Sequence, residues 1–94
     1  MSENKNIELE RHPSPERLEQ LGVTSWPTWE CGISTFPWHY DSTEIGYFLE
    51  GTVTVTPEGG EPLQVSQGDL VTFPAGMSCT WEVHHPVKKH YTFK

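Results

Sequence analysis

The sequence has few cysteines, few basic residues and no long apolar run. Its two cysteines are too few for the disulfide framework that stabilises many small secreted domains. Six Lys and Arg residues against thirteen Asp and Glu residues give a formal net charge of −7, which disfavours binding to a phosphate backbone. No apolar run approaches the roughly 20 residues of a membrane-spanning helix, and the polar first residues do not resemble a secretory signal. We therefore expect a cytoplasmic protein that binds neither nucleic acid nor membranes.

The chain is instead rich in aromatic residues and in turn formers. Its 94 residues are enough for one domain, and four Trp, three Tyr and four Phe supply the large side chains that so small a core needs. Each of these side chains buries about 150–250 Å² when it is fully enclosed. Eight Gly and eight Pro mark many turns, and short strands between such turns predict an antiparallel barrel or sandwich.

The first residues are predicted to form an arm, 1–13, before a single domain, 14–94. Ile7 and Leu9 alternate with acidic residues, a pattern that fits a short edge strand and fits a frayed terminus equally well. A short helix follows the arm. Ser14 supplies its N-cap, Pro15 suits its first turn and Gly22 ends it.

From Gly32 onward the side chains alternate with the period of two that is typical of strands. Phe36, Trp38 and Tyr40 share one face of the first strand, and His39 takes the other face. Turns are expected at residues 57–62, 68–69, 74–76 and 84–86, with a last strand over 87–93. The run from Leu70 to Phe73 is apolar on both faces, and together with exposed sheet edges it suggests a homodimer.

Two blocks of this strand pattern have a distinctive spacing. In the first, Gly32 is followed by five residues, then by Trp38 and Tyr40 around one residue, then by Glu44 and, after six intervening residues, by Gly51. In the second, Gly68 is followed by five residues and then by Pro74. Gly76 comes after one more residue, and Cys79 after two more.

Both blocks resemble the two motifs of the cupin superfamily, with every glycine, the proline and the acid in register. The resemblance implies an all-β fold of the cupin type, a double-stranded β-helix or jelly-roll barrel, with one short N-terminal helix. More narrowly, the chain is similar to the small single-domain cupins grouped with the cupin domain of (S)-ureidoglycine aminohydrolase, a metal-dependent hydrolase of allantoin breakdown. The short relatives generally have no assigned activity. Among the residues that carry this likeness are Trp26, Trp29, Tyr47, Glu50, Asp69, Phe73, Trp81, His90 and Tyr91.

The resemblance also locates the positions that hold the metal in metal-binding cupins, and three of the four have changed. They read Trp38, Tyr40, Glu44 and Cys79 where those cupins have His, His, Glu and His. An indole only donates hydrogen bonds, and a tyrosine ligates only as a phenolate, whose reference pKa is about 10. Glu44 and Cys79 alone are too few for an ordinary site. We expect no metal cofactor; if one is bound, its ligands are Glu44, Cys79 and Tyr40.

Three functions remain open on the sequence alone, and it does not decide whether the protein is an enzyme. The leading one is a cupin that binds a small planar or cationic molecule in an aromatic pocket. The second is a metal-dependent hydrolase that uses Glu44 and Cys79. The third is a structural barrel filled by its own side chains, in which Glu44 pairs with the hydroxyl of Tyr40 or the indole of Trp81. The predicted pocket is lined by Trp38, Tyr40, Glu44, Phe48, Cys79 and Trp81.

The remaining polar side chains are predicted to lie outside this pocket. A carboxylate beside Cys79 opposes thiolate formation, and by alternation His39 faces away from it, so cysteine catalysis is not expected. The two neighbouring residues Lys88 and Lys89 are expected to be a solvated pair.

Overall fold

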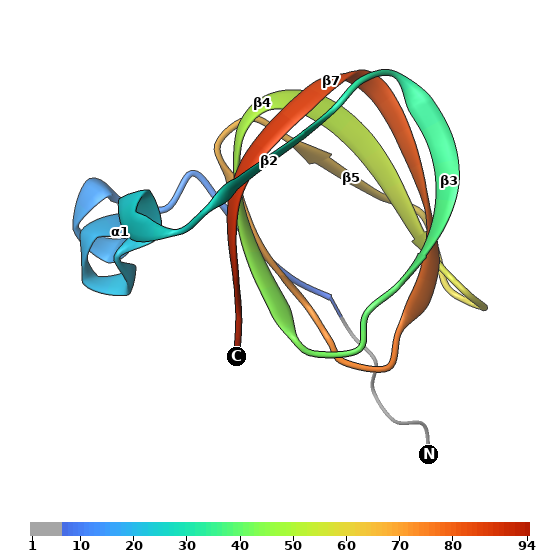
Figure 1. Cartoon of the computed structure of the whole chain (residues 1–94), viewed down its shortest axis with the longest axis horizontal. Coiled ribbons are helices and arrows are strands. Elements are labelled where there is room, and N and C mark those ends of the chain that lie inside the picture. Colours follow the sequence, from blue (N-terminus) through green and yellow to red (C-terminus); the bar gives the residue numbers. More distant parts are fainter. Residues whose placement is uncertain (1–6) are drawn as a thin grey trace.

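The computed structural model describes residues 7–94, in which seven antiparallel strands curve around a common interior and one short helix lies outside them (Figure 1). The sheet has the strand order β1-β6-β4-β7-β2, with β3 added to β7 and β5 added to β4. This is the predicted all-β cupin barrel. The elements are β1 (Glu8–Arg11), the helix α1 (Pro15–Leu21), a single 3-10 turn η1 (Val23–Ser25), β2 (Thr28–Cys31), β3 (Ser34–His39), β4 (Glu44–Pro57), β5 (Leu63–Ser66), β6 (Asp69–Phe73) and β7 (Ser78–Phe93).

Two long bent strands, β4 and β7, connect the two ends of the barrel. The sequence predicted a turn over 84–86, and this prediction is wrong, because β7 continues through these residues to Phe93. The bend is made by three register shifts between β4 and β7 instead of a turn. Proline is tolerated in a strand at such an irregularity, which explains why Pro86 does not end β7.

Gly51 lies at this bend and is required there. Its φ is +96°, a region that other residues rarely adopt. A Cβ atom at this position would lie 2.8 Å from the carbonyl oxygen of His85 on β7. The glycine therefore allows β4 and β7 to approach each other closely where both strands bend.

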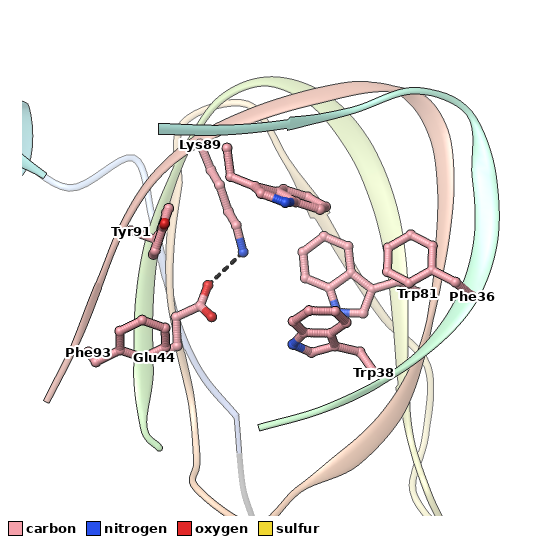
Figure 2. A pocket seen from close by; sticks show the side chains of 8 residues that line it. Phe36, Trp38, Glu44, Trp81, Lys89, Tyr91 and Phe93 are labelled. Carbon is pink, nitrogen blue, oxygen red and sulfur yellow. Dashed lines mark hydrogen bonds and ion pairs between the residues drawn. The ribbon is translucent and has the colours of Figure 1, made fainter. Parts of the chain in front are cut away.

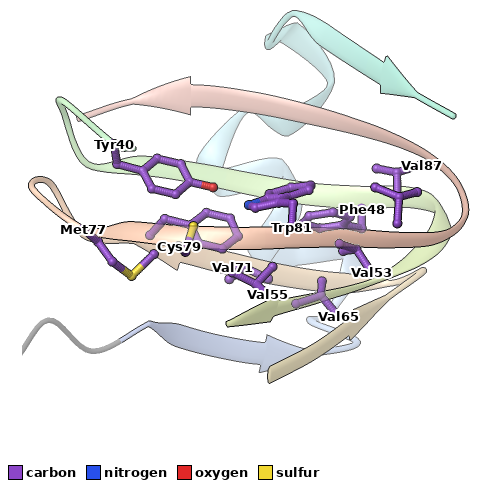
Figure 3. Packing of buried hydrophobic residues seen from close by; sticks show 12 residues of the cluster. Tyr40, Phe48, Val53, Val55, Val65, Val71, Met77, Cys79, Trp81 and Val87 are labelled. Carbon is purple, nitrogen blue, oxygen red and sulfur yellow. The ribbon is translucent and has the colours of Figure 1, made fainter. Parts of the chain in front are cut away.

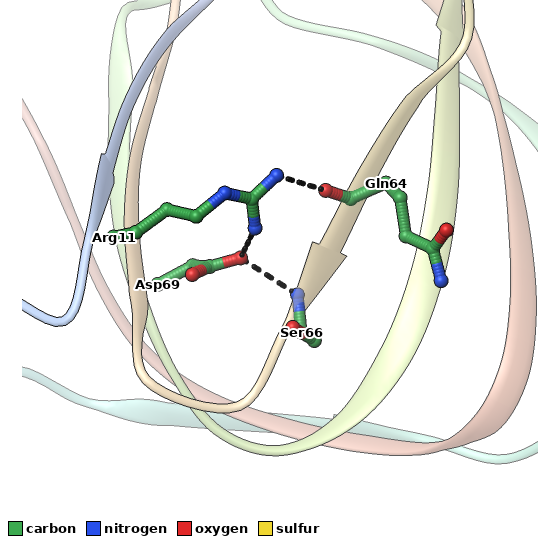
Figure 4. Close-up of polar contacts among 4 residues, drawn as sticks. All are labelled: Arg11, Gln64, Ser66 and Asp69. Atoms are coloured by element: carbon green, nitrogen blue, oxygen red, sulfur yellow. Dashed lines mark hydrogen bonds and ion pairs between the residues drawn. The ribbon is translucent and has the colours of Figure 1, made fainter.

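The N-terminal part follows the sequence closely. The Ser14 hydroxyl accepts a hydrogen bond from the Arg17 amide at 3.1 Å, and Gly22 ends α1 in the left-handed conformation, as predicted. The strand β1 pairs with β6 at one end of the sheet. Figure 4 shows how its last residue, Arg11, donates to the carboxylate of buried Asp69 at 2.9 Å. The same carboxylate oxygen accepts from the Ser66 amide at 2.9 Å.

A cluster of buried side chains fills much of the barrel (Figure 3). The rings of Tyr40 and Phe73 stack at 4.9 Å between centroids, and Phe73 lies 5.9 Å from Trp81. Trp81 in turn stacks on Phe48 at 6.2 Å. Valines of β4, β5, β6 and β7 complete the cluster.

No helix in residues 7–94 is both long enough and apolar enough to cross a membrane.

Candidate ligand-binding cavity

A cavity of about 200 Å³ lies at one end of the barrel, beside the packed aromatic cluster. The cavity has room for several water molecules. The strands β2, β3, β4 and β7 supply the wall, and side chains of alternate residues on β7 point into it (Figure 2). The lining residues are Trp29, Phe36, Trp38, Glu44, Trp81, Lys89, Tyr91 and Phe93.

A buried ion pair forms the polar part of this wall. The Lys89 ammonium donates to Glu44 Oε2 at 2.6 Å, and the two side chains are only 6% and 7% exposed. The expectation that Lys89 is solvated is therefore wrong. The carboxylate of Glu44 has a different partner from the expected Tyr40 or Trp81, because Lys89, on the neighbouring strand β7, extends past Gly46 along the inner face of the sheet to Glu44.

The Lys89 ammonium also sits among aromatic rings. Its nitrogen lies 4.7 Å from the centroid of the Trp81 ring and 5.1 Å from that of Trp29, and two phenylalanine rings are 5.8 Å away. Such rings attract a cation through their negative faces. Burial lowers the pKa of Lys89, while the charge of Glu44 opposes that shift. The cage of rings is thus filled by a cation that belongs to the chain itself.

The six residues predicted to line a pocket are not all brought together at this cavity. Trp38, Glu44 and Trp81 lie on its wall. Tyr40, Phe48 and Cys79 are buried in the neighbouring hydrophobic cluster instead.

Tyr40 and Cys79 are held in their neutral forms by this packing. Burial raises the pKa of Tyr40, and the charges of Glu44 and Cys79 raise it further. Burial also raises the pKa of the Cys79 thiol to about 11, although the positive charge of Lys89 opposes the shift. The Tyr40 hydroxyl and the Trp81 indole nitrogen face each other in Figure 3, yet within residues 7–94 neither has a hydrogen-bond partner. In the metal-free protein both groups are therefore protonated at neutral pH, and neither is a reactive nucleophile.

The four cupin metal positions therefore do not fit a metal ion. Trp38 is 47% exposed at the rim of the cavity and has no lone pair to offer. Tyr40 and Cys79 are neutral, and Glu44 is already paired with the ammonium of Lys89. In the described part of the chain, no three His, Cys, Asp or Glu side chains are grouped so that they could hold a metal.

The histidines near the predicted site lie elsewhere. His39 is exposed and its Nδ1 is 2.8 Å from the Ser78 hydroxyl, on the opposite face of β3 from Trp38. His84 and His85 are exposed and contact threonines of β4. None of these three side chains lines the cavity.

Sequence reasoning missed Lys89 as a member of the site, although one signal was present. Lys89 has the same strand phase as Val87, Tyr91 and Phe93, and a lysine in phase with apolar residues is placed toward the interior by alternation. A second signal was that a buried carboxylate at Glu44 needs a charged or hydrogen-bonding partner, which a lysine in the interior would supply. Phe36 shares its strand face with Trp38, so alternation also indicated Phe36, whereas no pattern in the sequence pointed to Trp29 as part of the same wall.

Comparison with solved structures supports the fold over nearly the whole chain. A DUF861 family protein from Thermotoga maritima is 47% identical, with a TM-score of 0.92 over 95% of this chain and 100% of that one. Two further solved structures are similar over 68% of this chain, each with a TM-score of 0.62. They are a putative ethanolamine utilization protein Q from Salmonella typhimurium, 30% identical, and the EutQ protein of Clostridium difficile, 26% identical.

The match to these two proteins covers only 51% and 46% of their own lengths, so the similarity concerns about half of each. Among curated proteins, none matches the chain. The family described as EutQ-like cupin domain matches residues 18–91, which include β2 to β6, most of β7 and all the residues that line the cavity except Phe93. The chain therefore belongs to the EutQ-like cupin domain family of the cupin superfamily.

Proposed function

We propose that the chain binds a small molecule in the cavity beside the Glu44–Lys89 pair, without a metal cofactor. The cavity is walled mainly by aromatic side chains and carries one polar pair, the composition of many small-molecule sites. Two large aromatic side chains stand exposed at this end, Trp38 at 47% and Phe93 at 58%. Large exposed apolar side chains beside a cavity are typical of a binding site.

One observation carries this proposal, namely that the buried ion pair borders a cavity, although aromatic rings surround its ammonium. A buried ion pair is a poor source of stability, because well-packed apolar residues of similar volume are often as stable or more so. The Glu44–Lys89 pair is almost fully shielded from solvent, yet both side chains border the open space. Recognition of a ligand accounts for a charged pair in this place better than stability does.

A metal-dependent hydrolase, as the likeness to the cupin domain of (S)-ureidoglycine aminohydrolase implies, is the main alternative. The described residues do not favour it, because the donors at the four metal positions do not suit a metal. Metal analysis of protein purified without chelators tests it. A stoichiometric divalent metal that is lost in the variants Glu44→Ala and Cys79→Ala would overturn the proposal.

A barrel filled by its own side chains is the other alternative. The cluster around Tyr40, Phe48 and Trp81 does fill the part of the barrel next to the cavity. The space of about 200 Å³ at the end of the barrel is what supports a binding function against this alternative.

The four tryptophans allow a direct test by NMR. Trp29, Trp38 and Trp81 line the cavity, whereas Trp26 does not. A screen of small aromatic and amide compounds is expected to yield compounds that shift the three indole N–H signals and leave that of Trp26 in place. The variant Trp38→Ala should weaken binding, and Ile33→Ala, at an exposed residue that does not line the cavity, should not. If no compound shifts the three signals selectively, the proposal is wrong.

A further inference from the structure

We propose that the ligand of this cavity is a small, neutral, planar molecule with a carbonyl oxygen and an N–H group on one edge, as in a primary amide or a lactam. This inference rests on the proposed function, since it names the class of molecule that the same site takes. It comes from the charge balance of the cavity and from the hydrogen-bonding groups that the ion pair presents to it.

The charge balance argues against a cationic ligand, although aromatic rings beside a carboxylate normally favour one. Here Lys89 already supplies the cation, with its nitrogen 2.6 Å from Glu44 Oε2 and 4.7–5.8 Å from four ring centroids. A second cation close to Glu44 would also be close to Lys89, so attraction and repulsion would largely cancel. It would then lose its hydration without compensation.

An anionic ligand meets the corresponding difficulty. It could approach the Lys89 ammonium, but the Glu44 carboxylate is in contact with that ammonium and would repel it. No other cationic side chain lines the cavity among the described residues. Glu44 and Lys89 together are neutral, and a neutral ligand is the one that enters without leaving a charge uncompensated.

The pair nevertheless offers strong hydrogen bonds to a neutral molecule. Lys89 has three N–H donors, of which one is directed to Glu44 Oε2. The second carboxylate oxygen of Glu44 is turned toward the cavity in Figure 2, and both side chains border the open space. A donor and an acceptor therefore lie side by side on one wall, and an amide edge carries the complementary acceptor and donor in the same plane.

The aromatic walls add the requirement for a flat shape. Phe36 and Trp81 have ring planes only 24° apart, and Trp29 meets Trp81 edge to face at 84°. Rings in these orientations favour a planar ligand, which can stack on one ring and contact the edge of another. The volume of about 200 Å³ has room for a single substituted ring.

Three compounds of nearly identical shape test the inference: benzamide, benzamidinium and benzoate, which are neutral, cationic and anionic. Each is titrated into labelled protein near neutral pH, and the indole N–H signals of Trp29, Trp38 and Trp81 are followed. We expect benzamide to bind at least about tenfold more tightly than either charged compound, the effect of about one hydrogen bond to a charged group. Tighter binding of benzamidinium or benzoate would overturn the inference and leave the proposed function intact.

Two variants check the reason for the preference. In Lys89→Met the cation is removed, so the cavity keeps the Glu44 carboxylate and gains room among the rings, and the order should reverse to favour benzamidinium. Lys88→Met changes the neighbouring lysine, whose side chain is 40% exposed and lies outside the cavity, and should keep the preference for benzamide. If Lys89→Met does not fold, the ranking in the unaltered protein still decides.

The two levels of the proposal fail in different ways. If other compounds of the NMR screen shift the three indole signals but benzamide does not, the ligand class is wrong and the binding function stands. If Lys89→Met folds and still prefers benzamide, the charge-balance argument is wrong and the inference falls with it. If no compound of any charge shifts the signals, the binding function itself is wrong.

Discussion

Replacement of Lys89 by methionine is the change that most directly tests how the interior of this barrel is held together. Methionine keeps the length and much of the volume of the side chain, and its thioether still packs well against aromatic rings. The change removes the hydrogen bond of 2.6 Å to Glu44 and the cation among the four rings. The Glu44 carboxylate, whose side chain is 7% exposed, is then buried without its partner.

The expected cost is large for a protein of this size. Removal of one member of a buried ion pair typically destabilises a protein by about 3–5 kcal/mol, because the other charge is left uncompensated. In a domain of about 60–100 residues each kcal/mol lowers the melting temperature by about 4–8 °C, so we expect a fall of at least about 12 °C. Lost cation–π contacts act in the same direction.

Urea unfolding at neutral pH and low temperature, followed by tryptophan fluorescence, measures the change. The control is Lys88→Met, which removes only an exposed contact of 3.9 Å with Glu30 and should cost less than about 1 kcal/mol. The double variant Lys89→Met with Glu44→Leu removes both charges and should recover most of the lost stability. If Lys89→Met is no more destabilising than Lys88→Met, the buried pair does not have the role assigned to it.

Three further predictions concern other parts of the barrel. Burial raises the pKa of Cys79 from 9.0 to about 11, and a raised pKa contributes stability that is present below the unfolded value and lost as pH rises through this range. Between pH 9 and 11 the unfolding free energy of the unaltered protein should therefore fall more steeply than that of Cys79→Ala; equal slopes in urea unfolding at stepwise pH would contradict this. Asp69→Ala should cost roughly 2–4 kcal/mol, because the buried carboxylate accepts from both the Arg11 guanidinium and a backbone amide, and Arg11→Ala should cost less in the same assay. Gly51→Ala should lower the melting temperature far more than Gly59→Ala, since both have positive φ but only Gly51 has a backbone oxygen in the path of a Cβ atom; similar effects would show that the approach of β4 and β7 is not what requires glycine.

The sequence by itself determined the architecture. The spacing of Gly32, Glu44 and Gly51, with that of Gly68, Pro74 and Gly76, predicted the cupin barrel through its resemblance to the cupin motifs, whose glycines and proline mark where the chain bends whatever packs beside it. The helix boundaries were predictable for the same local reason: a capping serine and a left-handed glycine act on their own turn of backbone.

The composition of the site was decided only by the tertiary structure. Alternation assigns a residue to a face of its strand, but it does not say which residue of another strand lies opposite. The partner of Glu44 depends on how β4 pairs with β7: Phe48 lies opposite Lys89, and the Lys89 side chain passes Gly46 to reach Glu44, 45 positions earlier in the chain, at 2.6 Å. A lone lysine in a strand is normally solvated, so its burial becomes favourable only where a carboxylate and aromatic rings surround it. The physical reason is that the free energy of a buried charge is set by its neighbours in space, and these are specified only once the barrel has closed.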